Sequence, residues 1–508
     1  MTDMQPSAPP GACGRLTTPS FRRGLASLLC VVLAMQPLGL ARAQTSRLPD
    51  LGDESQSLIT PVQERRMGEG VVRQIRGAGA YLDDPEVNDY LNLLGQRLVA
   101  AVPSGQADFE FFAVADPAIN AFALPGGFVG VNSGLIVLAQ TESELASVLA
   151  HEISHVTQHH LTRSVAGAQR SMLYSLAALA VALAAARSGG SSSGQATSAA
   201  IASAQALAIQ SQINYTREHE YEADRIGFQR LEAAGFDVNA MATFMERLQK
   251  TTRFADAAAP TYLRTHPVTY ERIADAQARA HDKPYRQVAD SLDFHMVRAL
   301  LRSYVGTPKD AVDFFRDALA ERKYNNEVAT RYGLVASLLR ASQFDRAKAE
   351  LAALEKKAPP HPMVEAMAGH VLMESGDTPG ALKRFESALQ RYPNKMQLVY
   401  DYPETLLKAG RPRDASAFLE RELARFPGDG RLHSLAARTY AALGNMTRQH
   451  LHQGELYAWQ GDLKGAITQL ELAAKARDGD FYVMSVIDTR LKALRRDLED
   501  EKALAKNG

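Results

Sequence analysis

The second half of the chain repeats with a period of 34 residues, and this period restricts the fold more than any other feature. Turn-forming segments begin at four positions with this spacing, Ser342, Gly376, Gly410 and Gly444. Prolines recur at the same interval, at Pro359, Pro393 and Pro427. A fixed period of this length is typical of repeat proteins, in which each unit buries its apolar face against its neighbours. The sequence therefore predicts a stack of similar units.

A small residue follows the turn in successive units, as Ala347, Ala381 and Ala415. The interval, this alanine and the closing proline together resemble the tetratricopeptide repeat, a pair of helices that stacks into a superhelix. We predict an α-solenoid over residues 290–508, with irregular units at Gly306 and Gly461 capping the array. A helical domain without repeats is the alternative. No catalytic group of residues stands out in this region, so its expected role is binding.

The bulk composition limits the classes of partner. The 508 residues contain 57 Lys and Arg against 57 Asp and Glu, and 46% of them are hydrophobic. Balanced charge offers no basic surface for phosphates, so nucleic acid is not an expected partner. The length predicts two or three domains, each with its own core.

Residues 1–43 have the pattern of a secretory signal peptide. Arg22 and Arg23 precede an apolar run over residues 25–40, and small residues then offer a cleavage site before Gln44. The run is short for a membrane span, although a retained membrane anchor is the alternative.

Both cysteines, Cys13 and Cys30, lie within this leader. The mature chain is therefore expected to form no disulfide and no thiolate metal site. Export and the absence of cysteine together predict localisation in the periplasm.

Residues 44–285 differ from the repeats, because their pattern predicts short strands among helices. Residues 109–115 read as a strand, and the segments "AFALP" and "FVGVN" read as two more, joined by a Pro-Gly-Gly hairpin at residues 125–127. An extended peptide can add to a sheet edge through main-chain hydrogen bonds. We therefore predict a substrate-binding strand, with an ordinary core hairpin as the alternative. Its residues are Asn120, Ala121, Phe122 and Ala123.

Residues 150–160, "AHEISHVTQHH", concentrate histidines on one predicted helix. The helix begins at Thr141, and its apolar stripe comprises Leu145, Val148, Leu149, Ile153 and Val156. His151 and His155 are four residues apart on an adjoining face, where two imidazoles can reach one metal ion. Glu152 is the candidate general base, because it lies next to the metal without being needed as a ligand.

The two remaining histidines of this segment are not expected to bind the same ion. His159 lies roughly 12 Å along the helix axis from His151, which is too far for one metal. His160 would point elsewhere on a regular helix. A solvated or supporting role is the prediction for both.

A catalytic zinc site needs a third protein ligand and an open position. The candidate is "EHEYEAD" at residues 218–224, inside a helical pattern that stops near Gly235. Glu220 and Asp224 are four apart, so one can ligate the metal while the other fixes a neighbouring histidine by a hydrogen bond. A solvated acidic face is the alternative.

An apolar, alanine-rich run covers residues 172–186 and is followed by "RSGGSSSGQ". It is too short and too weakly hydrophobic for a membrane span. We expect a mobile helical hairpin or lid over this part of the chain, with peripheral membrane contact as the alternative.

Four motifs in this order carry a family resemblance: "NAFALPGG" from Asn120, "HEISH" from His151, "EYEAD" from Glu220 and "THP" from Thr265. They resemble the zinc metallopeptidases related to HtpX and the CAAX prenyl proteases. With a cleaved leader and a tetratricopeptide tail, the chain most resembles the periplasmic BepA (YfgC) type. The implied fold is mainly α, with a gluzincin-like α+β metallopeptidase domain over residues 44–285.

The resemblance also implies roles for individual residues. His151, His155 and Glu220 match the three ligands of one Zn²⁺, with Glu218 and Glu222 as spectators. Glu152 matches the general base, and Asp224 belongs to the same catalytic motif. His266 matches a regulatory fourth ligand that can occupy the open zinc position and keep the enzyme idle.

The predicted function is zinc-dependent endopeptidase activity with a chaperone-like role. The resemblance implies unfolded or misassembled outer-membrane β-barrel proteins as substrates, and the outer-membrane assembly machinery as a partner. The alternative is an adaptor whose repeats carry the biology while its metal domain is latent or structural.

Overall fold

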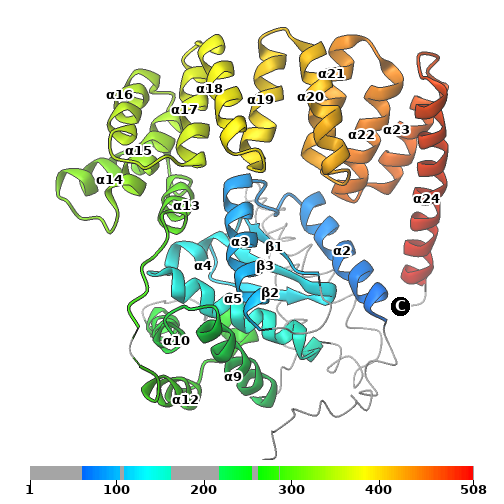
Figure 1. The fold of residues 1–508 in the computed structure, drawn as a ribbon. Helices are drawn as coiled ribbons and strands as arrows, with labels where there is room; N and C mark the ends of the chain where they lie inside the picture. The colour runs from blue at the N-terminus through cyan, green and yellow to red at the C-terminus, as the bar shows by residue number, and fades with distance from the viewer. Residues whose placement is uncertain (1–59, 103–107, 162–216, 254–260, 285, 507–508) are drawn as a thin grey trace, which may run out of the picture. The chain divides into compact units, whose positions relative to one another are not determined.

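The computed structural model describes residues 60–102, 108–161, 217–253, 261–284 and 286–506. All of them belong to one compact unit that spans residues 54–508. The predicted signal peptide and the apolar run at residues 172–186 lie outside the described residues. As predicted, the fold is mainly helical, with a small sheet in its first half and helical repeats in its second (Figure 1).

The sheet has the strand order β1-β3-β2. Strand β1 (Glu110–Val114) runs parallel to β3 (Phe128–Asn132), and β2 (Ala121–Leu124) runs antiparallel to β3. A short 3-10 turn at Pro125–Gly127 joins β2 to β3, with φ values of 74° and 90° at its two glycines. Left-handed values of this kind favour glycine, so the predicted Pro-Gly-Gly hairpin is confirmed.

The histidine-bearing helix is α5 (Glu142–Thr157). The side chain of its N-cap residue Thr141 accepts the backbone N–H of Glu144 at 3.2 Å. The Glu144 carboxylate accepts the N–H of Gln140 at 2.7 Å, one residue before the position used in a capping box. The predicted apolar stripe faces the main core, and Val156 is only partly buried.

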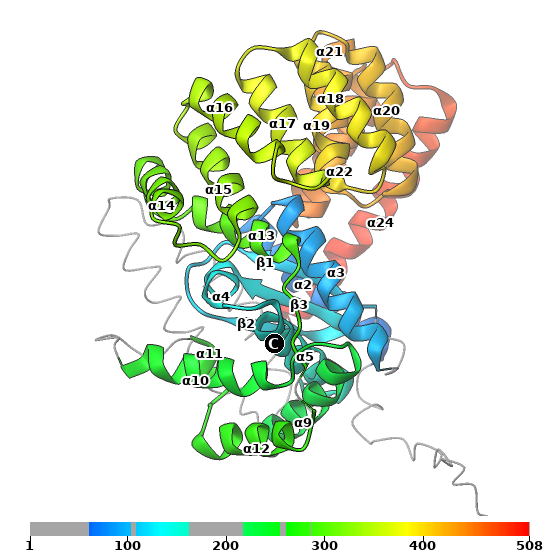
Figure 2. The same cartoon turned by 60° about the vertical axis from the view of Figure 1, so that its left-hand side comes forward.

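Helix α5 packs against α3 (Pro85–Ala101), α9 (Arg217–Ala233), α10 (Asn239–Arg253) and β2. A side-chain carbon at Gly227 on α9 would lie 3.2 Å from the backbone nitrogen of His151. The absence of a side chain there lets the two helices approach at the level of the histidines. Among the described residues of this half, the other helices are α2 (Pro61–Gly77), α4 (Ser133–Leu138), α11 (Thr261–Thr265) and α12 (Tyr270–His281). Helices α9 and α12 lie on the side of the sheet away from the repeats (Figures 1 and 2).

Residues 286–506 form successive antiparallel helix pairs that stack side by side (Figure 2). The helices are α13 (Leu292–Ser303), α14 (Pro308–Ala320), α15 (Glu327–Arg340), α16 (Phe344–Glu355), α17 (Pro362–Glu374), α18 (Thr378–Arg391), α19 (Met396–Lys408), α20 (Pro412–Arg425), α21 (Gly430–Leu443), α22 (Met446–Gln460), α23 (Leu463–Lys475) and α24 (Phe481–Lys506).

The 34-residue period has a direct structural cause. The turns within four successive pairs adopt left-handed backbone at the predicted positions, Ser342, Gly376, Gly410 and Gly444, with φ between 55° and 85°. The alanines that follow these turns are fully buried, because each sits where its helix packs on the preceding one. The repeat prediction is thus confirmed, and the irregular units at Gly306 and Gly461 also turn through left-handed glycines.

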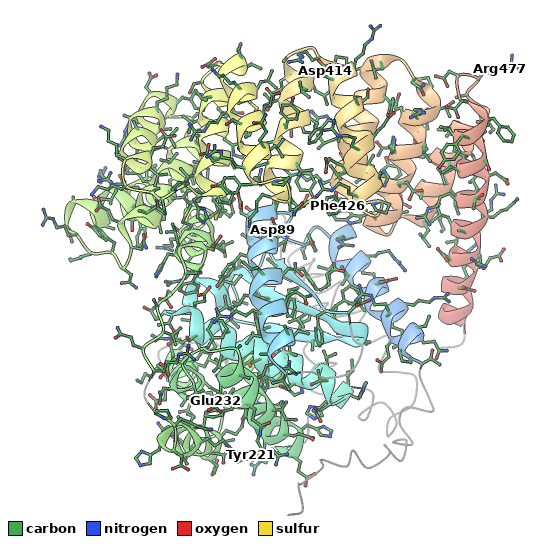
Figure 3. All side chains as sticks on the ribbon, viewed as in Figure 1. Asp89, Tyr221, Glu232, Asp414, Phe426 and Arg477 are labelled. Atoms are coloured by element: carbon green, nitrogen blue, oxygen red, sulfur yellow. The ribbon has the colours of Figure 1, made fainter. Side chains whose placement is uncertain are left out.

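The repeats contact the first half directly. The hydroxyl of Tyr304 donates to Asp84 at 2.8 Å, and the guanidinium of Arg76 lies over the ring of Trp459 at 4.4 Å. A cavity of about 1130 Å³ lies between α2, α3 and the repeat helices, and both Asp89 and Phe426 line it (Figure 3). Within the described ranges, no helix is long and apolar enough to span a membrane.

The buried alanines generate a test of the repeat packing. Ala381→Leu should lower the free energy of unfolding by about 1–3 kcal/mol, because added methylene groups have no space at a fully buried site. Ser387→Leu places the same side chain on an exposed position of α18 and should change stability little. Denaturant unfolding of both variants measures this difference in stability. Equal stability of the two variants would contradict tight packing around Ala381.

Candidate metal centre

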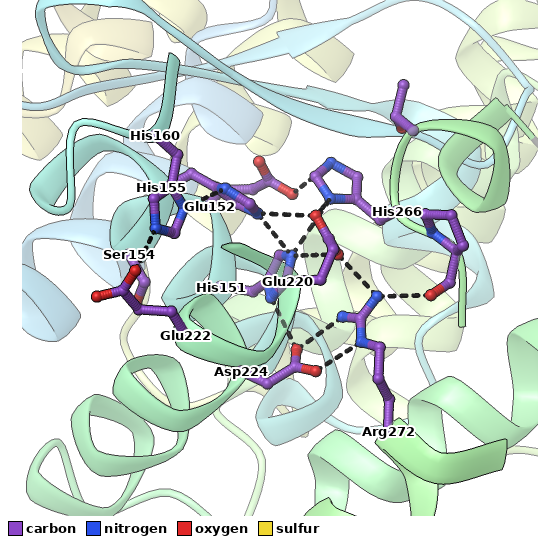
Figure 4. A network of polar contacts seen from close by, with 12 residues as sticks. His151, Glu152, Ser154, His155, His160, Glu220, Glu222, Asp224, His266 and Arg272 are labelled. Carbon is purple, nitrogen blue, oxygen red and sulfur yellow. Dashed lines mark hydrogen bonds and ion pairs between the residues drawn. The ribbon is translucent and has the colours of Figure 1, made fainter. Parts of the chain in front are cut away.

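Four buried side chains with metal-ligating atoms converge between α5, α9 and the segment after α11 (Figure 4). Helix α5 provides His151 and His155, α9 provides Glu220, and His266 directly follows α11. Their ligand atoms all lie within 4.8 Å of one another, and each residue is at most 3% exposed. The structure therefore brings together all of the residues that the sequence singled out as metal ligands.

The distances between these atoms fit a zinc ion. Nε2 of His155 lies 3.0 Å from Nε2 of His151, which in turn lies 3.5 Å from Oε2 of Glu220. Nδ1 of His266 lies 3.0 Å from Oε1 of Glu220 and 3.3 Å from Nε2 of His151. Ligand atoms at about 2.0–2.1 Å from a tetrahedral zinc are roughly 3.3–3.4 Å apart, so little movement is needed to bind one. Imidazole nitrogen and carboxylate oxygen are both ordinary zinc ligands.

A carboxylate contacts Nδ1 of His151, the ring nitrogen that does not face the other candidate ligands. This Nδ1 lies 3.0 Å from Oδ1 of Asp224, which leaves Nε2 directed at the ligand group. The guanidinium of Arg272 binds both oxygens of Asp224, at 2.6 and 2.8 Å, and also lies 2.7 Å from Glu220. It donates further to the carbonyl of Pro267 at 2.8 Å, next to His266. Asp224 thus contacts His151, one of the candidate ligands.

The charge states of these side chains depend on their contacts. Burial disfavours the charged form of His151, but hydrogen bonds to Asp224 and Glu220 outweigh it and raise the pKa to about 10. Burial and the positive His151 lower the pKa of His155 well below its usual range. Burial acts against ionised Glu220, but His266 and His151 hold its pKa well below normal. Metal binding requires neutral imidazole rings, so it would compete with protonation of His151.

Glu152 lies beside the ligand group and is fully buried. Neither of its carboxylate oxygens has a hydrogen-bond partner in the part of the chain that the structure describes. Nε2 of His266 is 3.6 Å from Oε1. Burial raises the pKa of Glu152, and the nearby His266 and His151 act in the opposite direction. A buried acceptor without a partner is costly and calls for an explanation, which a reacting group provides.

The predicted substrate-binding residues lie on and just before β2, at the edge of the sheet next to α5. Ala121 and Phe122 are buried, and Ala123 is partly exposed. Asn120 is completely buried, yet neither its amide nitrogen nor its oxygen has a partner among the described residues. A buried carboxamide without a partner is rare and marks a place where a bound group could be recognised.

The prediction that His160 points elsewhere is wrong. Helix α5 ends at Thr157, and His159 has a left-handed φ of 52°. This turn directs His160 back to His155, and the two Nδ1 atoms lie 2.9 Å apart. His159 is partly exposed and outside the ligand group, as expected.

Sequence reasoning missed Arg272 and Tyr262. Arg272 is 3% exposed, although arginine is rarely buried unless it is paired. The sequence did indicate this burial, because Arg272 adjoins the apolar stripe of α12 that contains Ile273, Ala276 and Ala280. The ring of Tyr262 lies 4.8 Å from that of His266, and no spacing in the sequence points to this contact.

Two family models and several named proteins are similar to this chain. A model described as peptidase family M48 matches residues 85–280, and a tetratricopeptide repeat model matches residues 372–448. The putative beta-barrel assembly-enhancing protease of Vibrio cholerae is 37% identical over 92% of this chain and 96% of its own length. The beta-barrel assembly-enhancing protease of Escherichia coli K12 is 33% identical over 96% of this chain and 100% of its own.

The chain belongs to this family of M48 proteases. It is a zinc metalloendopeptidase with a tetratricopeptide-repeat tail, and it is associated with the cell envelope. A mitochondrial metalloendopeptidase OMA1 from Schizosaccharomyces pombe is 31% identical over 36% of this chain and 50% of its own length. The adaptor alternative is therefore not favoured.

The Arg272 contacts generate a stability prediction. Arg272→Gln should destabilise the zinc-depleted protein by about 3–5 kcal/mol, because two buried carboxylates lose their charged partner. Arg279→Gln is the matched control, since its pair with Asp275 on the same helix is partly exposed and contributes about 0.3–0.5 kcal/mol. Denaturant unfolding in the presence of a chelator measures the stability of both variants. Similar losses of stability would show that the buried pairs of Arg272 contribute no more than an exposed pair.

Proposed function

We propose that this protein acts in the periplasm as a zinc endopeptidase with a chaperone-like role in outer-membrane protein assembly and quality control. Its substrates would be unfolded or misassembled β-barrel proteins, as the names of its relatives suggest. The observation that carries the proposal is the buried ligand group with, beside it, a glutamate that accepts no hydrogen bond from the described residues. We further propose residues 1–43 as signal peptide, 44–285 as peptidase domain and 290–508 as repeat domain. The two family matches fall within the second and third of these ranges.

In the proposed site, His151, His155 and Glu220 hold one zinc ion. When bound, zinc supplies Lewis acidity, which polarises a peptide carbonyl and makes water acidic near neutral pH. Asp224 orients His151, and Arg272 is the charged partner of both Asp224 and Glu220.

Glu152 is the proposed general base. Its oxygens lack hydrogen-bond partners among the described residues, so they are free to accept a proton from the attacking water. The same carboxyl would then deliver that proton to the amine of the leaving peptide. Burial, which raises its pKa, brings the carboxylate closer to the range in which it can both accept and return a proton.

Strand β2 is the proposed substrate-binding edge. It pairs with β3 on one side, and the helix that carries Glu152 packs against it. An extended peptide added to β2 would place a carbonyl near Glu152, and the carboxamide of Asn120 would then gain partners on the substrate backbone. This mode favours unfolded or edge-exposed substrates.

His266 is the proposed regulatory fourth ligand. Its Nδ1 lies among the ligand atoms and its Nε2 faces Glu152, so the ring occupies the space between metal and base. Substrate and water need that space, and the enzyme would therefore be idle until the segment of His266 moves. The Arg272 hydrogen bond to Pro267 would hold this segment in place.

The repeats are the proposed site for clients and for the outer-membrane assembly machinery. The cavity between α2, α3 and the repeats is large enough for several side chains of an extended segment. Peripheral membrane contact through residues 172–186 stays a prediction, and nucleic acid is not proposed as a partner.

The central test is Glu152→Gln. Casein cleavage should fall by about 100- to 10,000-fold, because proton transfer is lost. Zinc content should be unchanged, because Glu152 is not in the ligand group. Elemental mass spectrometry and cleavage are measured on the same samples, with Glu220→Gln as the control that should lose both. Full activity of Glu152→Gln would refute the mechanism, and a fully retained cellular phenotype would favour the adaptor alternative.

A second test concerns His266. His266→Ala should raise casein cleavage while zinc stays bound, because three ligands remain and the position beside Glu152 opens. Loss of zinc together with activity would instead make His266 an essential ligand and overturn the regulatory role.

A further inference from the structure

His160 is a completely buried imidazole that lies outside the ligand group. Its Nδ1 is 2.9 Å from Nδ1 of His155, and its Nε2 is 3.1 Å from Oε2 of Glu222 (Figure 4). The ring of His219 stacks on it, with centroids 4.5 Å apart and planes inclined by 16°. His155, His160 and Glu222 thus form a continuous line of contacts from a metal-ligand position to a carboxylate that is 30% exposed.

The backbone makes this contact possible. On a regular helix, a residue five positions after His155 lies about 140° around the axis and faces away from it. The end of α5 at Thr157 and the left-handed turn at His159 bring His160 back to the ligand face. Left-handed backbone is uncommon outside glycine, so the turn is a specific feature of this helix end.

The hydrogen-bonding capacity of the three groups fixes one arrangement. A neutral imidazole has one N–H donor and one acceptor nitrogen. If Nε2 of His155 binds the metal, its hydrogen is on Nδ1 and donates to Nδ1 of His160. The hydrogen of His160 is then on Nε2 and donates to Glu222, which as a carboxylate only accepts. Every hydrogen bond in this line therefore runs in one direction, away from the metal.

We propose that His160 and Glu222 are positioning residues for the zinc site, which hold His155 in the tautomer and ring orientation that directs Nε2 at the metal. The proposal rests on His155 being a zinc ligand, as proposed above. His160 and Glu222 would then orient the ring of His155 in the way that Asp224 and Arg272 orient the ring of His151. Partners of this kind tune metal affinity without touching the metal.

The test measures zinc affinity rather than activity alone. His160→Phe keeps a ring of similar volume but cannot accept the hydrogen bond, and Glu222→Ala removes the terminal acceptor. Each should weaken zinc binding by about 10- to 100-fold in chelator competition, because partners behind a histidine ligand typically contribute this much. The absorption spectrum of the cobalt-substituted protein should also shift, because the orientation of one ligand changes.

The two changes should not add. Because both act through one line of hydrogen bonds, the double variant should bind zinc about as tightly as His160→Phe alone. Glu222→Asp should recover part of the affinity lost in Glu222→Ala, which loss of bulk alone would not explain.

Two neighbouring variants serve as controls. His159→Asn removes an adjacent imidazole and keeps a residue that tolerates the left-handed turn. Glu218→Ala removes an exposed carboxylate of α9. Both should keep zinc affinity within about twofold of wild type, the usual range for uncoupled sites.

Several results would overturn the proposal. Wild-type zinc affinity in Glu222→Ala would do so even if His160→Phe fails to fold, because Glu222 is partly exposed and its removal leaves the core intact. Equal losses of zinc affinity in the control variants would show that the effect is only general destabilisation of the protein. Retained zinc affinity in His155→Ala would overturn the ligand assignment itself, which separates that failure from failure of the positioning role.

Discussion

Burial of negative charge is the constraint on which the peptidase half depends. Glu220 and Asp224 are both almost inaccessible to water, and a buried carboxylate persists only where a cation or several donors compensate it. Arg272 binds both of them and reaches them from the first turn of α12. The position of α12 is therefore set by electrostatics as much as by packing. Because Arg272 also binds the carbonyl of Pro267, the same guanidinium locates the segment that carries His266.

One guanidinium does not balance two buried carboxylates, so a further positive charge is needed. This need links folding to metal binding. Protonation of His151 would supply such a charge, because the contacts with Asp224 and Glu220 outweigh burial and raise the pKa of the ring to about 10. A zinc ion requires the neutral ring and would take over the role of the proton. The same carboxylates that tune the ligand therefore set a competition between proton and metal, and zinc binding is expected to stabilise the fold.

The parts that could be predicted from the sequence are those governed by a regular period. The 34-residue interval gave the repeats, and the four-residue spacing placed His151 and His155 on one face. The contact of His160 could not be predicted in this way, because a left-handed residue at His159 interrupts the period. The apolar stripe of α12 signals that Arg272 is buried, but its partners lie about 50 residues earlier and no local pattern encodes that pairing.

The metal helix is also tied to the repeats, and this limits how the two halves can move. The carboxylate of Glu142, the first residue of α5, accepts the hydroxyl of Ser291 at 2.6 Å and its N–H at 3.0 Å. In return, Asp290 accepts the N–H of Glu142 at 2.7 Å. These residues directly precede α13, where the repeats begin. Any displacement of α13 relative to α5 must break this reciprocal set of hydrogen bonds, so the first repeat and the ligand helix behave as one rigid element. Movement that opens the site is therefore expected in the His266 segment rather than in α5.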